Sequence, residues 1–292
     1  MAVDVLVTGA AGVLGREIVK TLRSANYQVM ACGRVPADGM DARWDVSRQD
    51  APEPDCSPGA VIHAAAKIGG YQHPLSDAKT LFDVNVTGTL RVARWCASRK
   101  VEHLTLVSGA IVYGEWSRCP KSEEDPVNPW MAGSYAVSKY CGEQAASLVR
   151  GSGTWLTVLR LSSLYGVGYA NGLAQRLINL GLETGSICIN PPVEDAFDLL
   201  HVSDGARAIQ RAMEHKQVGL WNVGSGTLTT IQGLAEACAR QIGVQVTIAD
   251  SVYSRPTRII NWVDDTKARR DLNHANRASL DSGIAEIVQS LR

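Results

Sequence analysis

Tyr135 and Lys139 stand four residues apart, a spacing that puts a phenol and an ammonium group on one face of a helix. A free tyrosine has a pKa of ~10 and is a poor acid or base at neutral pH. A neighbouring cation stabilises the phenolate and lowers that pKa, so the pair predicts proton transfer to or from a substrate oxygen. The same spacing also occurs in ordinary amphipathic helices, so the prediction depends on the surrounding residues.

A glycine-rich turn near the start of the chain predicts a second kind of chemistry. Gly9, Gly12 and Gly15 lie between a β-branched run over 3–7 and a helical pattern. The first glycine permits the tight turn, the second lets the backbone approach a pyrophosphate, and the third lets the helix pack closely on the strand. The predicted cofactor contacts in this turn are Gly9, Ala11, Gly12, Val13, Leu14 and Gly15. A glycine-rich turn that binds no ligand stays open as the alternative.

The end of the second predicted strand indicates which dinucleotide this turn would bind. An NAD site usually has Asp or Glu there, which accepts hydrogen bonds from the ribose 2′-hydroxyl. In this chain the strand ends in Cys32, Gly33 and Arg34. A guanidinium pairs well with a 2′-phosphate, so NADP(H) is the predicted cofactor. The alternative is that Arg34 is merely exposed, in which case NAD(H) would also serve.

The scaffold for these residues is predicted from alternating short apolar runs and helical patterns. This alternation is typical of an α/β fold with a doubly wound parallel sheet of the Rossmann type. The expected strands lie near 3–7, 27–32, 60–65, 101–107 and 155–161, and the expected helices near 81–99 and 135–150. After residue 162 the pattern loosens into loops, with order expected again over 197–213 and 220–226. We therefore predict a dinucleotide-binding domain over 1–165 and a smaller, mainly substrate-binding region over 166–292, with the chain returning to the larger domain near 199–213.

The composition excludes several other classes of protein. The 292 residues contain 29 basic and 29 acidic side chains, so nucleic acid and anionic membranes are not expected partners. Apolar runs are too short for a membrane span. The seven cysteines are scattered without a metal-ligand spacing, which favours free thiols in a reducing cytosol and no metal site. The expected protein is cytoplasmic and acts on a small molecule.

Taken together, these motifs resemble the extended short-chain dehydrogenase/reductases, also called the NAD-dependent epimerase/dehydratase family. The resemblance runs along nearly the whole chain and rests on matches in the same order at 45–46, 61–66, 85–89, 108–114, 160 with 165–166, 201–204 and 221–224. It implies a Rossmann fold and a homodimer formed through the helices at 81–99 and 135–150. It also implies further cofactor contacts from Asp45, Val46, Ala64, Ala65, Ala66, Asn85, Tyr135, Lys139, Leu161 and Ser163.

Two departures from the family pattern narrow the predicted activity. The family has Ser or Thr at the position of Gly109, where the hydroxyl holds the reacting oxygen of the substrate. Ser108 is a candidate catalytic residue one position earlier, although strand alternation should turn it to the other face; Ser134, Ser162 and Ser163 are alternatives. The Asp-Glu pair of sugar dehydratases is replaced by Ala110 and Ile111, which argues against a dehydratase.

Substrate contacts are expected from Lys67, Gly109, Ala110, Trp116, Phe197 and Arg255. Nucleotide-sugar enzymes of the family commonly carry Arg at the position of Phe197, whereas Arg255 matches a later basic position. The predicted function is therefore an NADP(H)-dependent oxidoreductase acting on a carbonyl or alcohol carbon of a sugar or a nucleotide-linked keto-sugar. Two alternatives stay open, a nucleotide-sugar epimerase with tightly held cofactor and a non-catalytic dinucleotide-binding protein.

Overall fold

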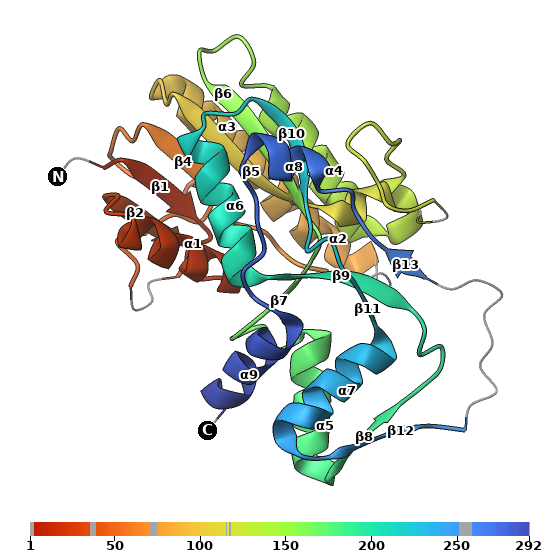
Figure 1. Cartoon of the computed structure of the whole chain (residues 1–292). Helices are drawn as coiled ribbons and strands as arrows, with labels where there is room; N and C mark the ends of the chain where they lie inside the picture. The colour runs from red at the N-terminus through yellow and green to blue at the C-terminus, as the bar shows by residue number, and fades with distance from the viewer. Residues whose placement is uncertain are drawn as a thin grey trace.

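A seven-stranded parallel sheet forms the centre of the chain in the computed structural model, which describes residues 3–35, 39–69, 75–114, 116, 118–250 and 259–291 (Figure 1). The strand order is β10-β6-β5-β4-β1-β2-β3. The strands are β1 (Val5–Thr8), β2 (Val29–Gly33), β3 (Ala42–Arg43), β4 (Ala60–His63), β5 (His103–Gly109), β6 (Trp155–Leu161) and β10 (Gly219–Val223). The order reverses beside β1, and ligands of such sheets bind at that switch point. The predicted doubly wound fold is confirmed.

Helices cover both faces of this sheet (Figure 1). Successive side chains of a strand point to opposite faces, so Val5 and Val7 of β1 belong to one hydrophobic core and Leu6 belongs to another. The first core includes α1 (Val13–Ser24) and α6 (Val202–Glu214). The second includes α3 (Thr89–Ser98) and α4 (Ser134–Ser147). Helix α4, which carries the predicted catalytic pair, is thus fixed by its packing against the sheet.

The single helix expected over 81–99 is interrupted in the structure. Helix α2 (Leu75–Phe82) leads into a π-helical segment, η1 (Asp83–Gly88), which is followed by α3. Asn85 lies within η1, and its side chain bonds to neighbouring segments. Gly88 lies against Val46, where an added Cβ would come within 2.9 Å of a Val46 methyl group. Such π-helical segments are frequent at functional sites.

The region after residue 162 contains more regular structure than the sequence predicts. Its strands are β7 (Ser163–Tyr165), β8 (Ser186–Ile189), β9 (Ala196–His201), β11 (Leu228–Thr230), β12 (Gln245–Ile248) and β13 (Ile260–Asn261), and its further helices are α5 (Leu173–Thr184), α7 (Ile231–Ile242), α8 (Thr266–Asp271) and α9 (Leu280–Ser290). The expectation of loops was wrong for α5, because its apolar face is buried against α7 and α9 in a third hydrophobic core. Helix α6 packs on α1, and β10 joins the large sheet. The division of the chain at residue 165, with a return to the larger domain near 199–213, stays a prediction.

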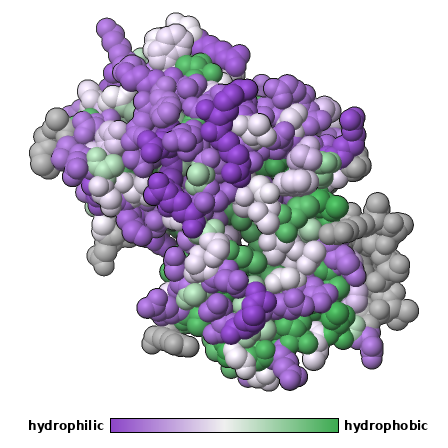
Figure 2. All heavy atoms as spheres, in the orientation of Figure 1, coloured by the Kyte–Doolittle hydropathy of each residue, from purple (hydrophilic) through white to green (hydrophobic). Residues whose placement is uncertain are grey.

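The surface differs between the two regions (Figure 2). Hydrophobic side chains are frequent over the lower part of that view, where α5, α7, β8 and β12 lie. Leu182 and Ile248 are among the large apolar residues exposed there. Within the described ranges, no helix is both long enough and apolar enough to cross a membrane.

Candidate active site

The glycine turn follows β1 and opens onto the N-terminus of α1. Gly9 has a φ of +70°, and a Cβ at this position would lie 2.5 Å from the backbone of Ala65. A Cβ on Gly15 would lie 2.1 Å from the Gly9 carbonyl oxygen, so helix and turn are in direct backbone contact. Gly12 is the N-cap of α1, and no side chain caps the helix or places an acid in its first turn. The N-terminus of α1 is therefore a free, positive end that suits a phosphate group.

A cavity of about 1050 Å³ begins at this turn and runs along the carboxyl ends of the strands. Its volume is at the upper end of the range typical of ligand sites. It brings together almost every residue that the sequence analysis selected. These are Gly9, Ala11, Gly12, Val13, Leu14, Gly15, Arg34, Asp45, Val46, Ala64, Ala65, Ala66, Lys67, Ser108, Gly109, Ala110, Trp116, Tyr135, Lys139, Leu161, Ser163 and Phe197. Arg255 lies outside the described residues.

Asn85 is not part of this lining and instead supports it from η1. Its Oδ1 accepts a hydrogen bond from the Lys67 backbone N–H at 2.8 Å, and its Nδ2 donates to the Lys67 carbonyl at 3.0 Å. The same Nδ2 donates to Ser138 Oγ of α4 at 2.9 Å. Asn85 therefore ties the loop after β4 to the helix that carries Tyr135.

Tyr135, Lys139 and Glu143 follow one another at intervals of four residues along α4, so they share one face of the helix. Lys139 is 8% exposed and its Nζ donates to the Val107 carbonyl at 2.8 Å. Burial lowers the pKa of Lys139 to about 8, although the charge of Glu143 opposes the change. The ammonium group is thus held in the lining of the cavity and stays charged at neutral pH.

The protonation of Tyr135 differs from the prediction. The sequence predicts that Lys139 lowers the pKa of this phenol. In the structure, burial raises the pKa of Tyr135 well above its ordinary value, and a charge on Tyr169 would raise it further. The direction is reversed because desolvation of the phenol dominates and the Lys139 ammonium is directed to the Val107 carbonyl. Tyr135 is accordingly a group that keeps its proton.

Glu143 lies at the end of this row, in a buried cluster that the sequence analysis missed. Its carboxylate accepts hydrogen bonds from Arg160 Nε at 3.0 Å and from Arg160 Nη2 at 2.8 Å. Ser108 Oγ donates to the same carboxylate at 2.6 Å, so this candidate catalytic hydroxyl is already engaged. Both side chains of the ion pair are 6% exposed. The cluster joins α4 to β5 and β6. The sequence did contain a signal for Glu143, because this residue continues the four-residue spacing of Tyr135 and Lys139.

A side chain at the position of the missing family hydroxyl would meet no clash at its Cβ. Gly109 has extended backbone angles (φ −142°, ψ 146°), and a Cβ there would have its nearest neighbours at 3.8 Å and 3.9 Å. Of the alternative serines, Ser162 Oγ donates to Asp198 at 3.2 Å, whereas Ser163 lines the cavity and is exposed. Tyr169 and Asn171 also line the cavity, and no periodic pattern in their loop indicated this.

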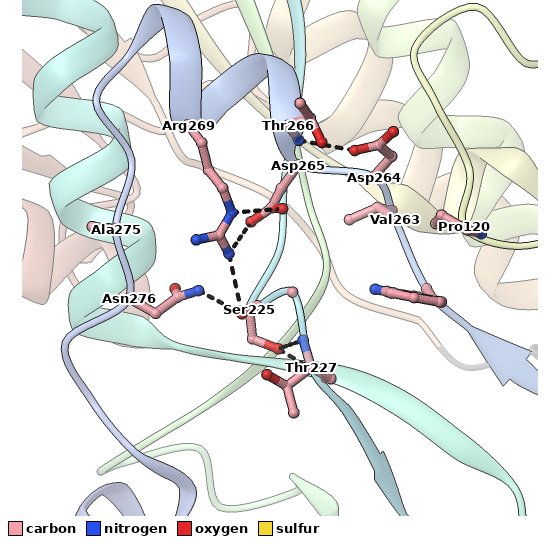
Figure 3. A pocket seen from close by; sticks show the side chains of 12 residues that line it. Pro120, Ser225, Thr227, Val263, Asp264, Asp265, Thr266, Arg269, Ala275 and Asn276 are labelled. Carbon is pink, nitrogen blue, oxygen red and sulfur yellow. Dashed lines mark hydrogen bonds and ion pairs between the residues drawn. The ribbon is translucent and has the colours of Figure 1, made fainter.

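A second cavity of about 530 Å³ lies between the end of β10 and α8 (Figure 3). Arg269 of α8 and Asp265, the residue just before this helix, form an ion pair in the lining of the cavity, with Nη2 and Oδ2 2.7 Å apart. Asn276 Nδ2 donates to the Ser225 carbonyl at 2.6 Å. Its lining includes no residue of the glycine turn and neither member of the catalytic pair. Across the described residues, no group of three or more His, Cys, Asp or Glu side chains could hold a metal ion.

Comparison with known proteins identifies the family. Residues 5–224 match the model of the NAD dependent epimerase/dehydratase family, and the chain belongs to this family. It is 29% identical to UDP-glucose 4-epimerase of Mycolicibacterium smegmatis over 98% of each chain. It is 26% identical to dTDP-glucose 4,6-dehydratase of Streptomyces niveus over 99% of this chain and 92% of that protein. The structure of MoeE5 in complex with UDP-glucose and NAD superposes with a TM-score of 0.82 at 25% identity, covering 99% of this chain and 100% of MoeE5.

Proposed function

We propose that this chain is an NADP(H)-dependent oxidoreductase that reduces a carbonyl carbon, or oxidises the corresponding alcohol, of a sugar or nucleotide-linked keto-sugar. The observation that carries the proposal is a single cavity that joins the glycine turn and Arg34 at one end to Tyr135 and Lys139 at the other. A binding protein would need the first set of residues but has no use for the buried pair. The predicted division at residue 165 fits this arrangement, with the cofactor held mainly by the first region.

The residues at the glycine turn fit a dinucleotide. The uncapped N-terminus of α1 faces the cavity and suits a pyrophosphate, and the close backbone contact at Gly9 and Gly15 fixes the turn. Arg34 lies in the same lining next to Gly33, where an NAD site would have an acid. NADP(H) is therefore the proposed cofactor, and it supplies or accepts the hydride when bound.

Tyr135 and Lys139 would carry the accompanying proton chemistry. Because burial raises the pKa of Tyr135, the phenol is protonated at neutral pH and can donate its proton to a carbonyl oxygen. The charged Lys139 ammonium lies one helical turn away and would stabilise the phenolate that remains. A protonated donor suits reduction of a carbonyl better than oxidation of an alcohol. We therefore favour a ketoreductase.

The proposed substrate class follows from the family and from the substrate end of the cavity. The relatives are named for UDP- and dTDP-linked sugars, which makes nucleotide-linked keto-sugars the first candidates. Phe197 of β9 and Trp116 give this end an apolar lining. Free keto-sugars belong in the same screen, because Phe197 replaces a common phosphate-binding arginine. The family resemblance also supports a homodimer, which light scattering coupled to size-exclusion chromatography would test.

A nucleotide-sugar epimerase is the second candidate, and similarity to a UDP-glucose 4-epimerase favours it. The two functions differ in cofactor stoichiometry. A ketoreductase consumes one NADPH for each UDP-linked or free ketohexose reduced, which absorbance at 340 nm follows. An epimerase converts UDP-glucose to its 4-epimer without net oxidation of added NADPH. Epimer formation without NADPH consumption would refute the ketoreductase proposal.

Cofactor choice is tested by binding. Fluorescence titration should give tighter binding of NADPH than of NADH to the wild type. Arg34→Ala should weaken NADPH binding alone, because it removes a charge-assisted contact worth ~1.5–3 kcal/mol, which is about 10- to 150-fold in Kd. Arg23→Ala is a matched control, since Arg23 pairs with Asp41 on the surface and does not line the cavity. Equal affinities of the wild type for both cofactors would contradict the assignment.

A further inference from the structure

The cavity lacks a hydroxyl at position 109, and two of the three serines that line it, Ser108 and Ser162, are already engaged, whereas Ser163 is exposed. Ser108 Oγ donates to Glu143 at 2.6 Å, and Ser162 Oγ donates to Asp198 at 3.2 Å. A carbonyl oxygen that receives a proton from Tyr135 needs a second donor, because hydrogen bonds aimed at the developing charge stabilise the transition state. The second donor therefore has to come from another hydroxyl in the lining of the same cavity.

Tyr169 lies in the loop between β7 and α5, and this loop is anchored at several points. The Tyr169 N–H donates to the Gly166 carbonyl at 3.3 Å, and the Gly172 N–H donates to the Tyr169 carbonyl at 2.7 Å. Gly168 has a φ of +84°, and an added Cβ there would lie 3.1 Å from Arg16 Nη2; Arg16 Nη1 donates to the Ala11 carbonyl of the glycine turn at 2.6 Å. The loop that carries Tyr169 therefore runs beside the proposed cofactor site.

The Tyr169 phenol belongs to the same cavity as Tyr135, Lys139 and Gly109. Its ring lies against Gly172, where an added Cβ would come within 3.2 Å of the ring Cδ1. Burial raises the pKa of Tyr169, so this phenol also stays protonated and can donate. A charge on Tyr169 would raise the pKa of Tyr135, so the two side chains are electrostatically coupled. Tyr169 therefore combines a hydroxyl that can donate, partial burial and a place in the cavity that holds the proposed proton donor.

We infer that Tyr169 holds the reacting oxygen of the substrate by a hydrogen bond, in place of the hydroxyl that is missing at Gly109. The inference rests on the proposed reductase function. During reduction, hydride from NADPH forms the new C–H bond, and the electron pair of the carbonyl π bond moves to oxygen, which takes the Tyr135 proton. NADPH is oxidised to NADP+ and the carbonyl is reduced to an alcohol. Tyr169 keeps its own proton throughout, and Tyr135 regains one from solvent.

The test compares Tyr169→Phe with a matched loss of a phenol elsewhere. Tyr27→Phe is the control, because Tyr27 donates to Glu214 at 3.3 Å and lies outside the cavity. With NADPH and the ketohexose that the wild type reduces, Tyr169→Phe should lower kcat about 10²-fold and leave the NADPH Kd within twofold. Adding Gly109→Ser to Tyr169→Phe should restore part of kcat, since a Cβ at position 109 would meet its nearest neighbours at 3.8 Å and 3.9 Å without a clash. A merely structural role for Tyr169 would give no such rescue.

A second readout does not depend on turnover. In protein labelled with 13C at tyrosine Cζ, the Tyr135 signal is assigned by its loss in Tyr135→Phe. This signal should shift in Tyr169→Phe and stay in place in Tyr27→Phe. The inference would be overturned if the Tyr135 signal does not move or if Tyr169→Phe keeps a wild-type kcat. It would also be overturned if Ser163→Ala lowers kcat more than Tyr169→Phe does. If the wild type oxidises no NADPH with any ketohexose, the proposed function fails, and the Tyr135 signal alone decides whether the two phenols share a site.

Discussion

Glu143→Gln would neutralise one half of a buried ion pair while leaving the shape of the side chain nearly unchanged. The carboxylate is 6% exposed and accepts three hydrogen bonds, two from Arg160 and one from Ser108. Burial by itself would lower the pKa of Arg160. The hydrogen bonds to Glu143 and the charge of that carboxylate outweigh burial and raise the pKa of Arg160 above its ordinary value. After the substitution, the Arg160 guanidinium would remain charged and buried without its counter-ion.

Removing one partner of a buried ion pair lowers the free energy of unfolding by about 3–5 kcal/mol. Because the amide oxygen of Gln can still accept a hydrogen bond, we expect a decrease near the lower limit, about 3 kcal/mol. An unfolding entropy of about 2.1 cal/mol/K per residue gives about 0.6 kcal/mol/K for this chain, so Tm should fall by about 5 °C. Urea titration followed by circular dichroism measures the free energy of unfolding, and calorimetry measures Tm.

Glu102→Gln is the matched control, because Glu102 and Lys216 form an ion pair whose side chains are 52% and 61% exposed. Exposed pairs contribute about 0–1 kcal/mol, so this variant should unfold close to the wild type. Equal losses for the two Glu→Gln variants would refute the reasoning, since burial would then have no bearing on the energy of the pair. Such a result would also remove the support proposed for the position of α4.

Three further outcomes are expected. Gly15→Ala should lower the free energy of unfolding, measured by urea titration, by about 1–3 kcal/mol, because the new Cβ would lie 2.1 Å from the Gly9 carbonyl oxygen. A wild-type free energy of unfolding would contradict this close contact. The kcat should decline as the pH rises through about 8, because Lys139 then loses its proton and no longer stabilises the phenolate. A kcat that stays constant from pH 6 to 10 would exclude a role for that charge. Lys139→Ala should lower kcat and also weaken NADPH binding in a fluorescence titration, and an unchanged Kd would show that Lys139 does not contact the cofactor.

Much of the first half of the chain could be predicted from local patterns. Trp155–Leu161 forms the strand expected from its apolar run, and α4 begins within one residue of the expected helix. The glycine turn lies between β1 and α1 as its spacing requires. The apolar residues of these elements recur with the period of a strand or a helix. This local pattern can be read from a single sequence and is enough to predict the elements.

The rest depends on contacts between distant residues. Asn85 bonds to Lys67 and Ser138, and no helical pattern over 81–99 indicates the π-helical segment that contains it. The partner of Ser108 is Glu143, 35 residues away, so strand alternation alone could not identify it. Tyr169 lines the cavity from a loop whose course depends on its glycines and on backbone hydrogen bonds to Gly166 and Gly172. Such positions become visible only when the chain is folded.

The central claim is that Tyr135 transfers the proton while the glycine turn and Arg34 hold the cofactor. The most direct test is a comparison of wild type and Tyr135→Phe for NADPH oxidation with the same ketohexose and for NADPH binding by fluorescence. General acid–base groups contribute about 10²–10⁴-fold, so kcat should fall by a factor in that range while the NADPH Kd stays within about twofold. If Tyr135→Phe retains a wild-type kcat, another group transfers the proton and the claim is wrong.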